Sequence, residues 1–179
     1  MDGKKLAQLF RKSNRIIIKR DKDCFWVTDT YALVRLDNML ASDFIAKWNS
    51  YKSTDNIPFL EEDNIYDISY TGSRFIKNKD PIGKVLKAAT ADDLKDITLT
   101  GLSKIVDGEP KRIFKSGESL GLIDNKYLFI IDGLTPEKIK TKGKLSPLVL
   151  FDDKKNIVGL IMPVRSKKAI KEELKSLAG

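Results

Sequence analysis

The chain has 179 residues, of which 41% are hydrophobic and 32% are charged, and its formal net charge is +8. This composition is typical of a soluble globular protein with one sizeable core, and it argues against wholesale disorder. One cysteine and no histidine exclude an internal disulfide, the usual zinc ligand sets and every nucleophile that needs a histidine base.

The excess of lysine and arginine favours contact with a polyanion, and nucleic acid is the commonest such partner. The alternative is that the excess lysine only keeps the protein in solution. No apolar run approaches the ~18 residues that a membrane span needs, and the N-terminus has no long apolar stretch. We therefore expect a cytoplasmic protein with no membrane partner.

The first amphipathic segment is residues 3–12, which predicts a short helix. One side of this helix is apolar. The other side is cationic and carries Lys4, Lys5, Arg11 and Lys12. A β-branched run over residues 14–20 then predicts a buried strand, and residues 24–36 predict a further strand or a broken pair of strands.

The next part of the chain predicts a helix, a polar loop and a hairpin. Ser42 is expected to cap a helix over residues 43–51. Alternating residues over 65–77 predict a hairpin around Gly72. The acidic cluster at residues 61–63 is a candidate magnesium site of a carboxylate-dependent enzyme, but a solvated acidic turn is the favoured interpretation because no phosphate-binding glycine loop accompanies it.

The clearest helix signal begins at Asp80, which is expected to be the N-cap of a helix with Pro81 in its first turn. Apolar residues repeat behind Pro81 at the spacing i, i+3, i+4, i+7. Lys84 and Lys87 lie opposite this apolar stripe, so the helix repeats the charge pattern of residues 3–12.

Residues 96–131 predict an antiparallel meander of short strands, the last of them over residues 126–131. Tight turns are expected at residues 107–108 (Asp-Gly) and 124–125 (Asp-Asn). An edge strand is expected at residues 138–141, where lysines would discourage further pairing.

The C-terminal part of the chain contains the stretch SPLVLFDDKKNIVGLIMPVR, which predicts a β-hairpin. Apolar runs at residues 148–151 and 157–162 flank its polar turn. Pro163 cannot donate to a strand ladder, so it is expected where the strand leaves the sheet and turns Val164 and Arg165 outward.

Two stretches resemble bacterial sliding clamps, the β subunit of DNA polymerase III. Residues 160–165 (LIMPVR) resemble the apolar strand and Met-Pro-x-Arg sequence on which clamp chains close. Residues 25–33 (FWVTDTYAL) resemble the Ala-Thr-Asp-Gly-His-Arg-Leu strand of the same family. The second stretch keeps Thr28, Asp29 and Leu33 but has Thr30, Tyr31 and Ala32 where the family has Gly, His and Arg.

The resemblance implies a peptide pocket and a surface that faces DNA. In the family the two strands line a hydrophobic pocket for short peptides of polymerases and other partners, which here implies a pocket of Thr28, Leu33, Leu160, Ile161, Met162, Pro163, Val164 and Arg165. The helices of the family line a hole with cations facing duplex DNA. This implies loose, non-specific DNA contact through Lys4, Lys5, Arg11, Lys12, Lys84 and Lys87.

The expected fold is α+β, with antiparallel sheets and short amphipathic helices on one side, in a sliding-clamp-like architecture. We expect one clamp-like domain over residues 1–165, either undivided or made of half-modules of about 1–75 and 76–165, and then a helix over residues 166–179.

The expected function is that of a small, divergent clamp-like processivity factor in DNA replication, of phage or mobile-element type. We expect no enzyme activity, metal or cofactor. The expected partners are duplex DNA, replication proteins that present short peptides, and further copies of the chain. The alternative is a clamp mimic that binds replication partners without encircling DNA.

Overall fold

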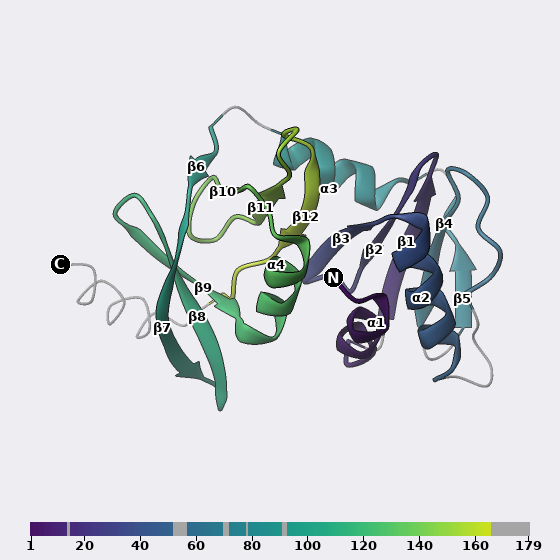
Figure 1. The fold of residues 1–179 in the computed structure, drawn as a ribbon, viewed down its shortest axis with the longest axis horizontal. Coiled ribbons are helices and arrows are strands. Elements are labelled where there is room, and N and C mark those ends of the chain that lie inside the picture. Colours follow the sequence, from purple (N-terminus) through teal and green to yellow (C-terminus); the bar gives the residue numbers. More distant parts are fainter. Residues whose placement is uncertain (14, 52–56, 70–71, 78, 91–92, 166–179) are drawn as a thin grey trace. The chain divides into compact units, whose positions relative to one another are not determined.

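The protein has an α+β fold whose described strands pair antiparallel within each of two compact units, Met1–Ala88 and Ala89–Gly179 (Figure 1). The structure is a computed structural model. It describes residues 1–13, 15–51, 57–69, 72–77, 79–90 and 93–165. The helix expected over residues 166–179 lies outside the described residues.

The first unit is built on five antiparallel strands in the order β5-β4-β1-β2-β3. Their bounds are β1 (Arg15–Asp21), β2 (Cys24–Thr28), β3 (Ala32–Leu36), β4 (Ile65–Ser69) and β5 (Gly72–Phe75). The predicted buried strand, the broken pair of strands and the hairpin around Gly72 are therefore confirmed.

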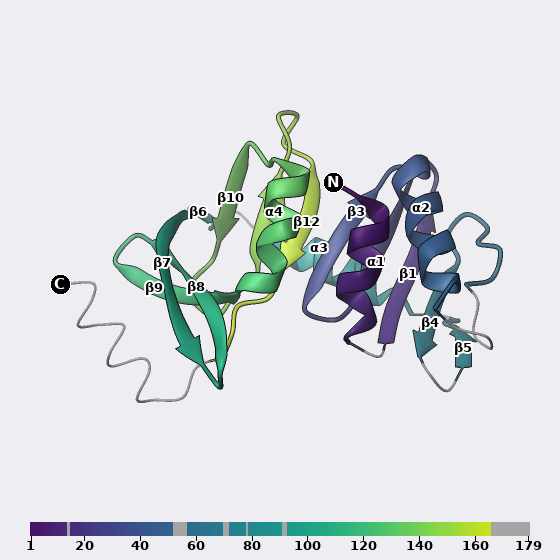
Figure 2. The same cartoon turned by 60° about the horizontal axis from the view of Figure 1, so that its bottom comes forward.

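Three helices pack on this sheet: α1 (Gly3–Arg11), α2 (Asn38–Asn49) and α3 (Pro81–Ala89). The first two pack against each other and contact β1, β2 and β3, whereas α3 lies on the opposite face (Figure 2). The expectation of helices on one side of the sheet is wrong for this unit. The reason is that the chain crosses to the other face after the edge strand β5.

Strand β1 explains why helices pack on both faces of the sheet in the first unit. Successive side chains of a strand point to opposite faces. Ile16 and Ile18 are fully buried and face α1 and α2, while Ile17 and Lys19 face α3. Lys19 Nζ lies 3.0 Å from a carboxylate oxygen of Asp80, the residue that precedes α3. Consecutive isoleucines thus contribute to two separate apolar layers.

Aromatic side chains fill the layer between α1, α2 and the sheet. The ring of Phe44 meets Phe10 edge-on at a centroid distance of 6.2 Å and stacks on Trp48 at 6.0 Å. The two helices approach closely at Gly3, where a Cβ would collide with the carbonyl oxygen of Leu40. The Phe10–Phe44 contact and the close approach at Gly3 therefore fix the distance between the two helices, while Trp48 extends the aromatic layer along α2.

The start of α2 differs from the prediction. The helix begins at Asn38, and the carboxylate of Asp37 accepts a hydrogen bond from the Leu40 N–H at 2.8 Å. Asp37 is as good an N-cap as Ser42, so Ser42 falls inside the helix. The start of α3 is as predicted, because the Asp80 carboxylate accepts a hydrogen bond from the Gly83 N–H at 2.7 Å.

The second unit contains a three-stranded sheet, β7-β8-β9, and four further strands that pair in the order β12-β11-β10-β6. The predicted C-terminal hairpin is confirmed. The bounds are β6 (Lys95–Asp96), β7 (Thr98–Val106), β8 (Glu109–Ser116), β9 (Ser119–Asp124), β10 (Lys138–Thr141), β11 (Leu148–Phe151) and β12 (Ile157–Ile161).

Strand β10 is not the edge strand that its lysines predicted. It pairs with β11 on one side and with β6 on the other. Lys140 is opposite Asp96 of β6, and its Nζ lies 3.7 Å from the Asp96 carboxylate. An acidic partner in the neighbouring strand thus lets a lysine-bearing strand accept a further neighbour.

Residues 126–131 form a helix rather than the predicted strand. A 3₁₀ turn, η1 (Asn125–Tyr127), leads into α4 (Leu128–Leu134). The carboxylate of Asp124 accepts a hydrogen bond from the Lys126 N–H at 3.1 Å, so it starts a helix where a tight turn was expected. A short apolar run does not distinguish a strand from a helix. The buried residues follow helical spacing and are Tyr127, Ile130 and Ile131.

We predict that Phe10→Ala lowers the free energy of unfolding of the first unit by about 3–5 kcal/mol, because the ring is fully buried and a cavity remains. Urea denaturation followed by tryptophan fluorescence measures the change. The matched control is Met39→Ala in α2, whose side chain is 73% exposed and whose loss should cost under about 0.5 kcal/mol. Equal losses in both variants would contradict the assignment of the core.

Candidate nucleic-acid and peptide interfaces

The outer face of α1 carries a compact group of cations, Lys4, Lys5, Arg11 and Lys12, hereafter the α1 basic face. All four side chains are exposed, while Leu6, Ala7 and Phe10 on the inner face are fully buried. Within the described part of the chain, no ion pair joins Lys4, Lys5 or Lys12 to a carboxylate. Arg11 stacks over the ring of Tyr51 at 4.4 Å, which fixes its guanidinium on this face.

The cations of α3 belong to a different surface. Lys84 and Lys87 are exposed, but α3 lies on the face of the sheet opposite α1. The six residues predicted to face DNA therefore do not form one surface within the first unit. Sequence periodicity shows which side of each helix is apolar, but it does not show which face of the sheet the helix covers.

A hollow of about 450 Å³ opens beside the start of α3, hereafter the basic cleft. Its floor is the face of β1, β4 and β5 that points toward α3, and Pro81 and Lys84 supply the helical wall. The charged residues that line it are Arg15, Asp67, Arg74, Lys77, Lys79 and Lys84. Only Lys84 among these was singled out from the sequence.

The carboxylate of Asp67 holds two guanidinium groups in the basic cleft. Arg15 donates from Nε to Oδ1 at 2.7 Å and from Nη2 to Oδ2 at 2.8 Å. Arg74 donates from Nη2 to Oδ2 at 2.9 Å. The side chain of Asp67 is only 9% exposed, whereas Arg15 and Arg74 are 49% and 75% exposed. One buried anion thus orients two cations that solvent reaches.

The hydrogen bonds between Asp67 and the arginines shift the pKa values of Asp67 and Arg15. Hydrogen bonds from Arg15 hold the pKa of the Asp67 carboxyl below its usual value, and Arg74 adds to this effect while burial opposes it. The same hydrogen bond to Asp67 raises the pKa of Arg15. The alternation of Arg15, Ile17 and Lys19 along one strand was the sequence signal that could have indicated this site. The carboxylate that Arg15 binds, however, lies on a strand about 50 residues further along the chain.

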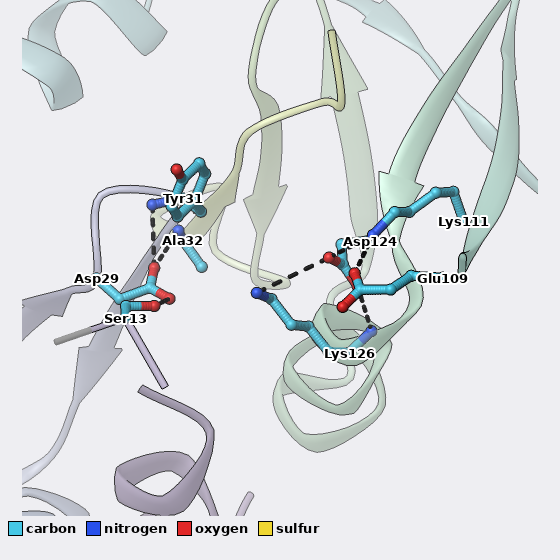
Figure 3. Close-up of polar contacts among 8 residues, drawn as sticks. All are labelled: Ser13, Asp29, Tyr31, Ala32, Glu109, Lys111, Asp124 and Lys126. Atoms are coloured by element: carbon cyan, nitrogen blue, oxygen red, sulfur yellow. Dashed lines mark hydrogen bonds and ion pairs between the residues drawn. The ribbon is translucent and has the colours of Figure 1, made fainter. Parts of the chain in front are cut away.

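The Asp29 segment that resembles a clamp strand forms the tight turn between β2 and β3 (Figure 3). Asp29 is 1% exposed, and its carboxylate accepts hydrogen bonds from the Ala32 N–H at 2.8 Å, the Tyr31 N–H at 3.0 Å and the Ser13 hydroxyl at 2.8 Å. Thr30 has a left-handed φ of 78°. This is the position where the clamp family has glycine, which adopts that conformation without strain.

The end of the C-terminal hairpin departs from its expected orientation. Strand β12 ends at Ile161, so the chain leaves the sheet before Pro163, as predicted. Val164 does not turn outward. Its N–H donates to the Leu122 carbonyl oxygen at 2.7 Å, and its side chain packs on the cluster of Val106, Ile113 and Leu122. Val164 thus packs on an apolar surface of the three-stranded sheet. The residues around position 164 give no sign of this contact, because the surface is formed by residues 106–122.

The residues of the predicted peptide pocket differ in their exposure. Leu160 and Ile161 are 2% and 0% exposed, whereas Met162 is 36% exposed and Arg165 is exposed. Pro163 is buried. Thr28 is half-buried and Leu33 is buried, and they are directly opposed across β2 and β3. The two parts of the pocket belong to different units, and the pocket itself stays a prediction.

The second unit contains a buried lysine that the sequence did not single out. Lys111 donates to Glu109 Oε2 at 2.6 Å and to Asp124 Oδ2 at 2.8 Å, and Lys126 lies 3.8 Å from the same Asp124 oxygen (Figure 3). Burial alone would lower the pKa of Lys111, but hydrogen bonds to both carboxylates raise it. A lysine held protonated in this way joins β8 to β9 through its ion pair with Asp124.

The acidic cluster at residues 61–63 lies in an exposed turn before β4. Among the described residues, no group of three or more Cys, Asp or Glu side chains is placed to hold a metal ion. The described helices include none that is both long enough and apolar enough to span a membrane.

Comparisons with family models, with curated proteins and with solved structures find no significant match to this chain.

Asp67→Asn should lower stability at neutral pH by about 1–2 kcal/mol, a modest value because solvent screens the exposed arginines. The folded-state pKa of Asp67 is depressed, so its contribution is present above the unfolded value and is lost as pH falls below about 4. The variant should therefore show a flatter loss of stability in acid. Thermal melts between neutral pH and the acid range measure this. Asp153→Asn, which removes an exposed carboxylate in the turn between β11 and β12, is the control and should change little.

Leu160→Ala should cost about 2–5 kcal/mol of folding stability, because the side chain is buried core. Met162→Ala should cost much less, because its side chain is partly exposed. If Met162 contributes to a peptide pocket, the Met162 variant should stay folded and bind an apolar peptide more weakly. Denaturant unfolding and peptide titration of both variants separate these effects. A destabilisation by Met162→Ala as large as that by Leu160→Ala would show that Met162 is core.

Proposed function

We propose that the protein is a non-catalytic accessory protein of DNA replication that resembles sliding clamps and contacts duplex DNA loosely. The α1 basic face carries this proposal. It places four exposed cations on one side of a helix whose other side is locked into the core by Phe10. Fixed cations on a rigid helix are suited to phosphates of any sequence.

The interaction with DNA would follow the physics of counterion release. Lys4, Lys5 and Lys12 are free of ion pairs with the described carboxylates, so binding phosphate does not require an internal ion pair to break. Each neutralised phosphate releases condensed counterions, which makes affinity fall steeply with salt. No base-reading interaction is needed, and the complex would be able to slide along DNA.

The proposed partners besides DNA are replication proteins that present a short apolar peptide. The pocket would be formed by Thr28, Leu33 and residues 160–165, with Met162 as its most exposed apolar residue. An exposed methionine is suited to such a role because its flexible, polarizable side chain adapts to different partners. Assembly of several copies would be required for a ring.

A second candidate is a clamp mimic that binds replication partners without encircling DNA. The placement of α1 and α3 on opposite faces of the first sheet favours it, because the cations of the two helices do not face one DNA channel within that unit. This candidate retains the peptide pocket and removes the need for a ring.

Replacing Lys4, Lys5, Arg11 and Lys12 with alanine should weaken binding to duplex DNA. The slope of log affinity against log salt should become shallower by about 0.9 for each phosphate that the variant no longer neutralises. Fluorescence anisotropy with labelled duplex over a range of salt concentrations measures both effects. A control with the same charge change replaces four exposed lysines of the second unit, Lys95, Lys115, Lys138 and Lys154.

Two outcomes discriminate between the candidate functions. Binding to circular duplex that disappears when the circle is linearised supports encirclement. Peptide binding by a chain that shows no duplex binding at low salt supports the mimic. An unchanged salt slope in the α1 variant would refute DNA binding through the α1 basic face.

A further inference from the structure

The basic cleft of the first unit has an excess of positive charge that is separate from the α1 basic face. Five cations line it, Arg15, Arg74, Lys77, Lys79 and Lys84, against the single carboxylate of Asp67. Within the described residues, none of the three lysines is ion-paired with a carboxylate. Like charges repel one another, so a concave surface with this excess favours an anionic occupant.

Asp67 prepares the two arginines for such an occupant. A guanidinium has five N–H donors, and hydrogen bonds to Asp67 use two from Arg15 and one from Arg74. The remaining donors belong to side chains that are 49% and 75% exposed. Planar guanidinium groups match the oxygens of a phosphate with paired hydrogen bonds, which an ammonium group does not provide.

The size and lining of the basic cleft suit a compact ligand. Its volume of about 450 Å³ lies within the range of small-molecule sites. Ile17, Ile76 and Pro81 provide apolar surface beside the cations. The lysines at positions 77, 79 and 84 stand where further phosphate oxygens would be neutralised.

We propose that the basic cleft is a phosphate-binding site, in which Arg15 and Arg74 hold one phosphate group and Lys77, Lys79 and Lys84 neutralise those next to it. The ligand chemistry is that of a phosphate ester, as carried by a free nucleotide or by a nucleic-acid strand. The site does not rest on DNA binding by α1, because it lies on the other face of the sheet and shares no residue with the α1 basic face.

The probes are inorganic pyrophosphate, a deoxynucleoside triphosphate and a short oligodeoxythymidylate, each titrated into the full chain at low salt by calorimetry. The test variant is Arg15→Lys with Arg74→Lys, which keeps the charge and removes the guanidinium forks. Its affinity should fall by about tenfold or more, the loss expected for a charge-assisted hydrogen bond. Tighter binding of the triphosphate than of the oligonucleotide identifies a nucleotide site, and the reverse identifies a strand-binding site.

A second variant keeps the test valid if the arginine variant fails to fold around Asp67. Lys77→Glu with Lys79→Glu changes only exposed side chains and should also weaken binding by about tenfold or more. Its matched control is Lys138→Glu with Lys154→Glu, which makes the same charge change outside the basic cleft and should leave affinity unchanged. Circular dichroism verifies folding. No saturable binding of any probe, or equal losses in the cleft and control variants, would overturn the proposal.

Discussion

The first unit depends on a strand that is buried on both of its faces. Ile16, Ile17 and Ile18 of β1 alternate between the two faces of the sheet, and all three are buried. A sheet with a central strand of this kind needs an apolar cover on each side. Helices α1 and α2 cover one side and α3 covers the other (Figure 2). The separation of the cations of α1 from those of α3 follows from this requirement.

The same requirement accounts for the basic cleft. Asp67 of β4 and Arg74 of β5 line the cleft beside Pro81 and Lys84 of α3. A carboxylate that is 9% exposed would be costly without partners, and the two arginines satisfy it. Because both arginines stay exposed while they bind the buried carboxylate, the compensation of one buried charge leaves an exposed cationic surface.

The resemblance to sliding clamps falls on residues with local structural roles. Asp29 closes the turn between β2 and β3, and Thr30 occupies the left-handed position that glycine has in the clamp family. Pro163 follows the end of a strand, while Val164 packs inward on the three-stranded sheet of its unit. Turn and strand-end chemistry thus explains the similarity, and the peptide pocket remains part of the proposed function.

Local patterns in the sequence were sufficient for the extent of α1 to within one residue, for the start of α3, and for the hairpins around Gly72 and over residues 148–161, because apolar periodicity and caps such as Asp80 act within a few residues. They were insufficient for residues 126–131, where a short apolar run fits both a strand and a helix. Only the tertiary structure decided which face α3 covers, where Val164 packs, and that Arg15 and Arg74 share Asp67. These outcomes depend on side chains that are distant in the sequence, and periodicity within one segment has no information about the surface that the segment will meet.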